Sequence, residues 1–271
     1  MRVVILCPSV YSETSCAMAV RLAQSGYVPV GALTLPSFDR STLARKLAQW
    51  GARGVADYAH SKLISRTRMD AQLRNPHLKP LLQHGFRSLR QVAAHYAFPI
   101  VTCKDQNAPD AIAQLREWSP DLCIFTGGNI LRSPLLQVPR RGVLNAHLGL
   151  LPEIRGMSSP EWSLLAGVPL GVTVHYIDAG IDTGPILLRR VLPDATRSES
   201  LDDLRHRLIA FGIEMVGEVV AALDRGTISA MPQSEFHQDN QYFVMHEWLQ
   251  ARAALRLKQG SPVAAAVRAH G

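Results

Sequence analysis

Short apolar runs alternate with segments of helical periodicity through the first half of the chain, and this alternation restricts the fold more than any other feature. In chain order, these strand-like and helical segments cover 2–7, 14–24, 28–34, 99–102, 111–118 and 122–125. Strands that alternate with helices build βαβ units, in which the strands pair in parallel and helices cover the sheet. The sequence therefore predicts an α/β fold with an open, doubly wound, mostly parallel sheet.

Composition supports a folded domain that lies in the cytoplasm. The 271 residues are 47% hydrophobic and 19% charged, which excludes disorder and permits a sizeable core. No apolar run reaches the roughly 18 to 20 residues that span a bilayer. The run that follows Arg2 stops at Pro8, and an export signal needs about 7 to 15 apolar residues. We therefore expect a buried first strand and no membrane partner.

The four cysteines indicate buried thiols. Cys7, Cys103 and Cys123 lie in apolar, strand-like runs, Cys16 lies in a helical segment, and no C-x-x-C occurs. This pattern favours free thiols in a reducing compartment over a disulfide framework or a zinc site.

The positive charge of the chain is concentrated in one segment. Between Asp39 and Arg90 there are eleven Lys and Arg residues against three Asp, and the whole chain carries +7. The segment is helix-prone, so we expect a basic helical insertion over 39–95. Two interpretations stay open: a solvated surface, or an electropositive wall for a phosphorylated ligand or RNA. The lack of interleaved aromatic residues and of any nucleic-acid motif argues against nucleic acid.

The last third of the chain predicts two helices. Apolar residues recur at three- and four-residue spacing over 200–225, with Ser200 suited to the N-cap and Gly226 to the position after the helix. A second helical run covers 242–258 and stops at Gly260. We expect one main domain over 1–230, a helical C-terminal extension over 231–271, and fraying from Ser261.

The stretch 125–188 holds the candidate functional side chains. The sequence contains no G-x-S-x-G, no P-loop, no G-x-G-x-x-G and no H-E-x-x-H motif, which argues against several hydrolase and nucleotide-binding classes. Asn145 and His147 lie two residues apart at the end of a strand pattern and share a face. Thr173 and His175 do the same in the strand 171–175, and a turn-rich loop then leads to Asp182. The carboxyl ends of parallel strands are where ligands bind.

Several alternatives remain on these residues alone. Asn145 could cap a loop, His147 could be a core histidine, and Asp182 could form an Asx-turn with the Thr-Gly that follows it. Asp-Thr-Gly also occurs in aspartic proteases, but those need a second such carboxylate. His147, His175 and Asp182 match a two-histidine, one-carboxylate metal site, although nothing else in the segment indicates a metal.

Four elements in a fixed order resemble the folate-dependent formyltransferases. They are Asn145-Ala146-His147, Leu151-Pro152, Gly171-Val172-Thr173-Val174-His175 and Asp182-Thr183-Gly184. The resemblance extends from about 120 to 192 and implies a Rossmann-like formyltransferase core. Leu148-Gly149 departs from the family, which usually has Pro-Ser after the histidine, and this affects the shape of the loop.

The resemblance implies an enzyme that uses 10-formyltetrahydrofolate as formyl donor and needs no metal. Asn145 and a protonated His147 would donate to the oxygen that becomes negative when an amine attacks the formyl carbon. Asp182 would orient His147, favour its charged form and relay the proton of the amine. Thr173 and His175 would contact the acceptor. The donor would bind the following residues: Phe125, Gly127, Gly128, Asn129, Ile130, Leu131, Tyr176, Ile177, Asp178 and Gly180.

The resemblance leaves the acceptor open. Enzymes of this family that act on tRNA add a β-rich C-terminal domain, whereas the residues after Ala230 read as helical. We expect a small amine, with an amino-sugar nucleotide first. Glycinamide ribonucleotide, a natural-product amine, hydrolysis of the donor and a non-catalytic binding module are the alternatives. Homodimerisation stays open.

The basic segment generates a test. If it borders the acceptor site, raising salt from 0.1 M to 1 M shortens the screening length from about 10 Å to about 3 Å and weakens capture of an anionic acceptor. The KM for the acceptor should then rise more steeply than the KM for a monoglutamyl donor, and reversing the charges of Arg66 and Arg68 should enlarge the difference. An acceptor KM that responds to neither change would assign the segment to a solvated surface.

Overall fold

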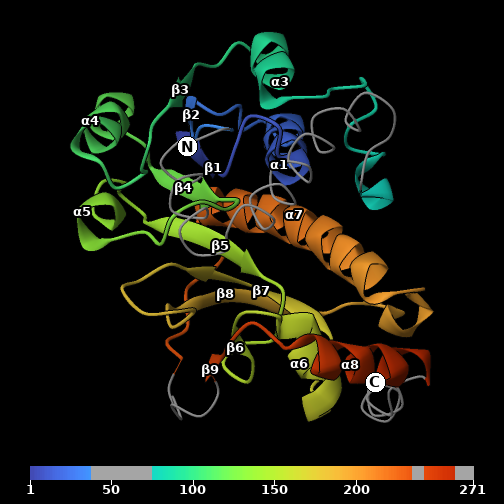
Figure 1. Cartoon of the computed structure of the whole chain (residues 1–271). Coiled ribbons are helices and arrows are strands. Elements are labelled where there is room, and N and C mark those ends of the chain that lie inside the picture. The colour runs from blue at the N-terminus through green and yellow to red at the C-terminus, as the bar shows by residue number, and fades with distance from the viewer. Residues whose placement is uncertain (38–74, 234–240, 260–271) are drawn as a thin grey trace, which may run out of the picture.

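A seven-stranded sheet forms the centre of the computed structural model, which describes residues 1–37, 75–233 and 241–259 (Figure 1). The strand order is β3-β2-β1-β4-β5-β7-β8. The first five of these strands are parallel, and β7 and β8 run antiparallel to their neighbours. Their bounds are β1 Val3–Cys7, β2 Gly31–Thr34, β3 Ile100–Thr102, β4 Leu122–Phe125, β5 Val143–His147, β7 Gly171–Tyr176 and β8 Ile186–Val191. This confirms the predicted α/β class with a mostly parallel sheet.

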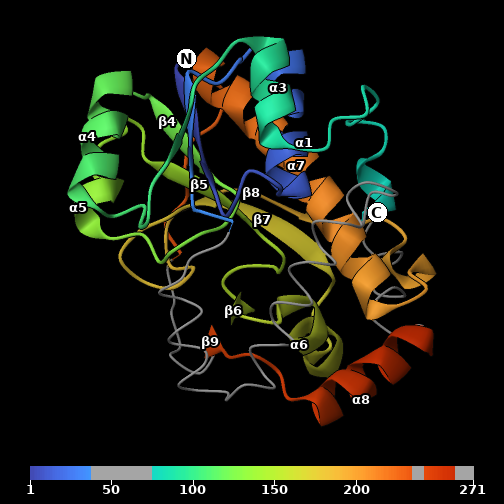
Figure 2. The same cartoon turned by 45° about the horizontal axis from the view of Figure 1, so that its top comes forward.

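Helices cover both faces of the sheet. In both views, α4 and α5 lie on one side of it, and α1, α3 and α7 lie on the other (Figures 1 and 2). Two short 3₁₀ turns, Pro76–Leu78 and Ala195–Arg197, precede α3 and α7. The helices are α1 Glu13–Gln24, α3 Leu89–Tyr96, α4 Pro109–Trp118, α5 Ser133–Leu136, α6 Ser159–Ala166, α7 Leu201–Arg225 and α8 Glu247–Lys258.

The first strand shows why the sheet is covered twice. Val3 and Ile5 pack into the cluster that includes residues of α1 and α7, and Val4 and Leu6 pack into the cluster that includes residues of α4 and α5. All four side chains are fully buried. A continuous apolar run of this kind fits a central parallel strand, because neither of its faces meets water.

The long helix α7 begins and ends as the sequence predicts. The Ser200 side chain accepts a hydrogen bond from the Asp203 N–H, and Gly226 adopts a left-handed conformation with φ 66°. These two caps satisfy backbone groups that the helix itself leaves unpaired.

The prediction of a helix from Tyr242 is wrong at its beginning. Residues Gln241–Tyr242 form the short strand β9, which pairs in parallel with β6, Arg155–Gly156. The helix α8 begins only at Glu247, because His246 is extended and its side chain accepts a hydrogen bond from the Trp248 N–H. The helix then packs against α6, as both views show (Figures 1 and 2).

Much of the predicted basic insertion lies outside the described residues, as does the C-terminal end from Ser261. Within the described part of the insertion, α3 packs against α1, and Lys79, Arg87 and Arg90 are exposed. The domain boundaries at 39–95 and 230–231 stay predictions.

All four cysteines are buried and free. Burial raises the pKa of the Cys7 thiol to about 12, so this thiol stays protonated at neutral pH. Within the described residues, no helix combines the length and the apolar character that crossing a bilayer requires.

The packing of β2 against α4 generates a stability test. A Cβ at Gly31 would lie 2.7 Å from ring atoms of Trp118, so Gly31→Ala should lower the free energy of unfolding by about 1–3 kcal/mol through overpacking. In a Trp118→Leu background the ring is absent, and the same substitution should cost much less. Urea unfolding of the two single variants and the double variant measures the coupling. Additive losses would contradict the contact.

Candidate active site

The order of strands reverses between β1 and β4, since β2 pairs with one edge of β1 and β4 pairs with the other. Ligands of open α/β sheets bind at the carboxyl ends of the strands at such a point. The loops after β1 and β4 touch there, because a Cβ on Gly127 would lie 3.3 Å from Cγ of Pro8. Gly127 and Gly128 have φ values of 129° and 148°, which side-chain-bearing residues rarely adopt.

A buried glutamine holds the loop that follows β4. Gln106 is fully buried. Its Oε1 accepts a hydrogen bond from the backbone N–H of Asn129 at 3.2 Å. The backbone N–H of Gln106 in turn donates to Asn129 Oδ1 at 3.2 Å. Its Nε2 donates to the Cys7 carbonyl at 3.3 Å. A side chain at Gly128 would overlap Gln106 Oε1. Gly128 therefore lets the Gln106 side chain pack directly against the backbone of this loop.

Only part of the predicted donor-binding loop is open to a ligand. Ile130 is 75% exposed, whereas Leu131 is buried in the core under α4 and α5. Phe125 lies beside Asn145 in the parallel pairing of β4 and β5, and it is half-buried.

The strands β5 and β7 bring four polar side chains to one face of the sheet. Asn145 lies opposite His175, and His147 lies opposite Thr173, and directly opposed residues point to the same face. The alternate residues Leu144, Val172 and Val174 belong to the core on the α7 side. The polar set therefore lies on the face turned away from α7.

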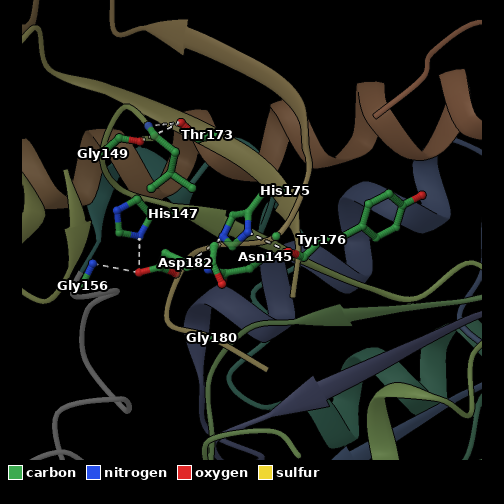
Figure 3. Close-up of polar contacts among 12 residues, drawn as sticks. Asn145, His147, Gly149, Gly156, Thr173, His175, Tyr176, Gly180 and Asp182 are labelled. Carbon is green, nitrogen blue, oxygen red and sulfur yellow. Dashed lines mark hydrogen bonds and ion pairs between the residues drawn. The ribbon is translucent and has the colours of Figure 1, made fainter. Parts of the chain in front are cut away.

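Asp182 reaches the same place from the loop between β7 and β8. Its Oδ2 lies 3.3 Å from His147 Nδ1 and accepts a hydrogen bond from the Gly156 N–H at 2.9 Å. Its Oδ1 lies 3.6 Å from His175 Nε2. Figure 3 shows the carboxylate between the two imidazole rings. The structure thus brings together Asn145, His147 and Asp182, and His175 joins them.

Backbone carbonyls set the proton positions on both rings. His147 Nε2–H donates to the Ile154 carbonyl at 2.8 Å, and His175 Nδ1–H donates to the Tyr176 carbonyl at 2.8 Å. His175 Nε2 lies 3.3 Å from Asn145 Nδ2 and 3.6 Å from Asp182 Oδ1. It can accept from the amide when it is unprotonated and donate to the carboxylate when it carries a proton. The remaining nitrogen of His147, Nδ1, faces Asp182, so a proton taken up there would be shared with the carboxylate.

In the free protein, burial opposes the charged form of His147 that the Asp182 carboxylate favours. Burial lowers the pKa of His147 and outweighs the Asp182 carboxylate, which raises it; nearby His175 lowers it further. Burial alone would raise the pKa of Asp182, but the contact with His175, the charge of His147 and the Gly156 N–H lower it to about 2. The site therefore pairs a neutral imidazole with an ionised carboxylate at neutral pH, and the imidazole is ready to accept a proton.

The structure places some predicted contact residues away from the open side of the site. Thr173 is fully buried, and its hydroxyl accepts from the Leu151 N–H and donates to the Gly149 carbonyl. The Tyr176 ring packs in the core on the α7 side, and Ile177 packs on the opposite side. These side chains hold the loops, so any contact of Tyr176 with a ligand would come from its backbone.

The Asx-turn that was an alternative for Asp182 is made by Asp178. Its Oδ1 accepts from the Gly180 N–H at 3.0 Å and from the Thr183 hydroxyl at 2.5 Å. A Cβ on Gly180 would overlap Thr183 Oγ1. Both predicted donor-binding residues therefore shape the loop that carries Asp182.

Residues that the sequence reasoning did not single out complete the site. Two of them act through backbone groups, the Gly156 N–H and the Ile154 carbonyl. Two others, Gln106 and Gln233, are side chains far in sequence from the loops that they bind. No sequence motif marks any of the four. Among the residues that the structure describes, no group of three or more His, Cys, Asp or Glu side chains is arranged to hold a metal ion.

A cavity of about 660 Å³ lies away from this site. It is lined by residues that include Arg116, Ser133 and Arg140, and it lies at the opposite edge of the sheet, where β4 and β5 begin. It contributes nothing to the cluster around Asp182.

Comparison with known proteins gives the class of the chain. The family model described as formyl transferase matches residues 77–220, which is more than half of the sequence. The chain belongs to the formyl transferase family. The match includes Asn145, His147, Gly156, His175 and Asp182.

Individual relatives agree with this assignment. The chain is 34% identical over 152 residues to the methionyl-tRNA formyltransferase of Geobacter metallireducens, which covers 54% of this chain and 48% of the relative. The chain thus spans about half the length of that relative. The solved N-formyltransferase from Helicobacter canadensis is similar over 95% of this chain and 80% of its own, with a TM-score of 0.56 and 14% identity. Glycinamide ribonucleotide transformylase 1 from Symbiobacterium toebii covers 83% of this chain and 89% of its own, with a TM-score of 0.54 and 19% identity. At these identities the two solved structures establish the fold.

The pair of His147 and Asp182 generates a pH test. Because the carboxylate raises the pKa of His147, Asp182→Asn should lower that pKa below its already depressed value. Titration of the histidine ring signals by NMR measures the shift. Asp224→Asn is the control, since Asp224 contacts Tyr27 and the N-terminal amine and lies away from the site. An unchanged or raised pKa in Asp182→Asn would contradict the pairing.

Proposed function

We propose that this protein transfers the formyl group of 10-formyltetrahydrofolate to the amine of an amino-sugar nucleotide. The observation that carries the transfer is the arrangement of Asn145, His147 and Asp182 on one face of the sheet. They lie next to the loop that follows β4, at the point where the strand order reverses. Membership of the formyl transferase family supports the reaction class.

The loop after β4 fits a flat heterocyclic donor. Gly127 and Gly128 leave backbone groups accessible for hydrogen bonds to ring edges, and the exposed Ile130 offers an apolar contact to a ring face. Folinic acid is bound in the solved Helicobacter canadensis enzyme, which supports a reduced folate as the donor. The donor supplies the formyl group, and the protein contributes placement and electrostatics.

The chemistry that the side chains support begins with attack by the neutral amine on the formyl carbon. A C–N bond forms to the acceptor, and the C–N bond to the folate nitrogen breaks. Asn145 can donate its amide N–H to the formyl oxygen as negative charge develops there. His147 Nε2–H is bonded to Ile154, so His147 acts in this proposal through Nδ1.

The proton balance assigns a role to the His147–Asp182 pair. The amine loses one proton as it becomes an amide, and the folate nitrogen gains one as it leaves. We assign the transient proton to His147 Nδ1, where the Asp182 carboxylate stabilises it. The imidazolium so formed also places positive charge near the oxyanion. A neutral resting imidazole fits this role, because a ring that is already protonated could not accept.

Aromatic side chains beside the site support a nucleotide acceptor. The strand β6, whose Gly156 N–H binds Asp182, pairs with β9. Tyr242 of β9 stacks on Trp162 with ring centroids 4.9 Å apart, and Phe243 is 72% exposed. Met157, next to Gly156, is 60% exposed. Exposed apolar groups of this kind offer a stacking surface for a base.

Two further observations guide the choice of acceptors. The Helicobacter canadensis enzyme was solved with dTDP-3-aminofucose, so amino-sugar nucleotides come first. The relatives at 30–38% identity are methionyl-tRNA formyltransferases, so methionyl-tRNA is the second acceptor class to assay, and glycinamide ribonucleotide is the third.

The deciding experiment incubates the full chain with 10-formyltetrahydrofolate and each acceptor. It follows release of tetrahydrofolate and the mass of the acceptor. Formylation of an amino-sugar nucleotide is the expected result. Formylation of methionyl-tRNA alone would overturn the acceptor, and release of tetrahydrofolate without any acceptor would identify a hydrolase.

Substitutions at the three polar residues test the mechanism. Asn145→Ala should lower kcat by about 10² to 10³, the usual cost of one oxyanion donor. His147→Ala and Asp182→Asn should lower it by about 10² to 10⁴, the range for general acid–base catalysis. Circular dichroism checks folding, and Asp224→Asn is the carboxylate control. Wild-type turnover in either His147→Ala or Asp182→Asn would refute the proton assignment.

The aromatic surface has its own test. Phe243→Ala should raise the KM of a nucleotide-linked acceptor in proportion to a loss of about 1–3 kcal/mol of stacking and should leave the KM of the donor unchanged. Leu255→Ala, which changes an exposed apolar residue of α8, is the control. A Phe243→Ala variant with a normal acceptor KM would remove the stacking surface from the proposal.

A further inference from the structure

The chain returns to the active-site loop after α7. Ile186, at the start of β8, and Met231 exchange two backbone hydrogen bonds of 2.8 Å each. Two residues later, Gln233 is 91% buried, with 9% exposed. The residues around Met231 therefore lie along the end of the loop that carries Asp182.

The Gln233 side chain continues this pairing past the end of the bridge. Its Nε2 donates to the Gly184 carbonyl at 2.6 Å and to the Asp182 carbonyl at 3.1 Å. Its Oε1 is buried and has no hydrogen-bond partner among the described residues. Burial of this unpaired oxygen costs desolvation free energy, and the two hydrogen bonds from Nε2 offset that cost.

The loop needs such support, because Asp182 is in an unfavourable conformation. Its φ is 54°, in the left-handed region, which costs a residue with a Cβ about 1–2 kcal/mol. The loop is also tight at Gly184, where a Cβ would overlap the Tyr176 carbonyl. A loop without outside contacts would tend to relax to negative φ, and the carboxylate would then leave His147 and the Gly156 N–H.

We propose that Gln233 is a positioning residue for Asp182: it fixes the backbone of the loop so that the carboxylate stays on His147. The proposal rests on the function proposed above for Asp182. Gln233 lies beyond residues 77–220, which the family model covers. The C-terminal segment of this chain is thereby part of the catalytic arrangement, although it supplies no group that touches the reacting atoms.

The first test compares Gln233→Met with Gln250→Met. Gln250 Nε2 also donates to a backbone carbonyl of the C-terminal segment, that of Met245 at 2.8 Å, but it does not contact the Asp182 loop. Gln233→Met should lower kcat by about tenfold to a hundredfold, the effect of a misplacement of about 1 Å, with the KM of donor and acceptor unchanged. Gln250→Met should leave kcat unchanged. A normal kcat in Gln233→Met, or an equal loss in both variants, would overturn the proposal.

Gln233→Glu adds a readout that a merely structural role would not move. In this variant the new carboxyl group faces the carbonyl oxygens of Asp182 and Gly184. The ionised form is repelled by both oxygens, whereas the protonated form can donate a hydrogen bond to the Gly184 carbonyl. The titratable groups in and beside the loop include Asp178, Asp182, His147 and His175, and all variants retain them. The ratio of kcat for Gln233→Glu to kcat for Gln233→Met should therefore rise as pH falls. A ratio that is independent of pH would count against the donor role.

The pKa of His147 separates this proposal from the proposed function. In the full chain without ligands, loss of Asp182 from its place should shift the NMR titration of His147 downward in Gln233→Met, toward the value of Asp182→Asn. Gln250→Met should not shift it. Should the wild type transfer no formyl group, the proposed function fails, and this titration still decides the positioning role. An unshifted His147 would overturn it.

Discussion

An ionised carboxylate that is largely shielded from water must be met by donors, and much of the structure around β5 and β7 satisfies this condition for Asp182. The Gly156 N–H binds its Oδ2, and two histidine rings lie beside it. Gly156 can serve because its strand β6 is held by β9. One buried charge thus links the loop after β7, the loop after β5 and the C-terminal segment.

The direction of β7 explains how these parts meet. Because β7 runs antiparallel to β5, its end at Tyr176 lies beside Leu144, away from the carboxyl edge of β5. The loop that follows must double back over the face of the sheet to bring Asp182 to His147. On the other face, Gly212 of α7 packs against Ala146 and Val172, where a Cβ would lie 3.2 Å from Ala146 Cβ. A helix covers one face of these strands, and loops cover the other.

Local patterns predicted the central strands, the capped helix α7 and the sharing of one face by Asn145 and His147, because each depends on side chains close in sequence. The start of α8 could not be predicted, since the pairing of Tyr242 with β6 and its stacking on Trp162 are long-range contacts. The effect of burial on the pKa of His147 could not be predicted either, because burial depends on the packing of every neighbouring loop. Gln233 acts over 51 residues of sequence, and a lone glutamine after a proline gives no sign of that.

The segment after α7 carries Gln233, which bonds the Asp182 loop, and β9, which precedes the exposed Phe243 and pairs with the strand that binds the Asp182 carboxylate. Under the roles proposed above for Phe243 and Gln233, selection for a new acceptor and selection for turnover would act on the same short stretch of chain. A substitution on the surface of this segment would be tolerated only if the pairing of β9 with β6 is kept. We expect divergence in such a protein to concentrate on outward-facing side chains, with insertions confined to positions between these two anchors.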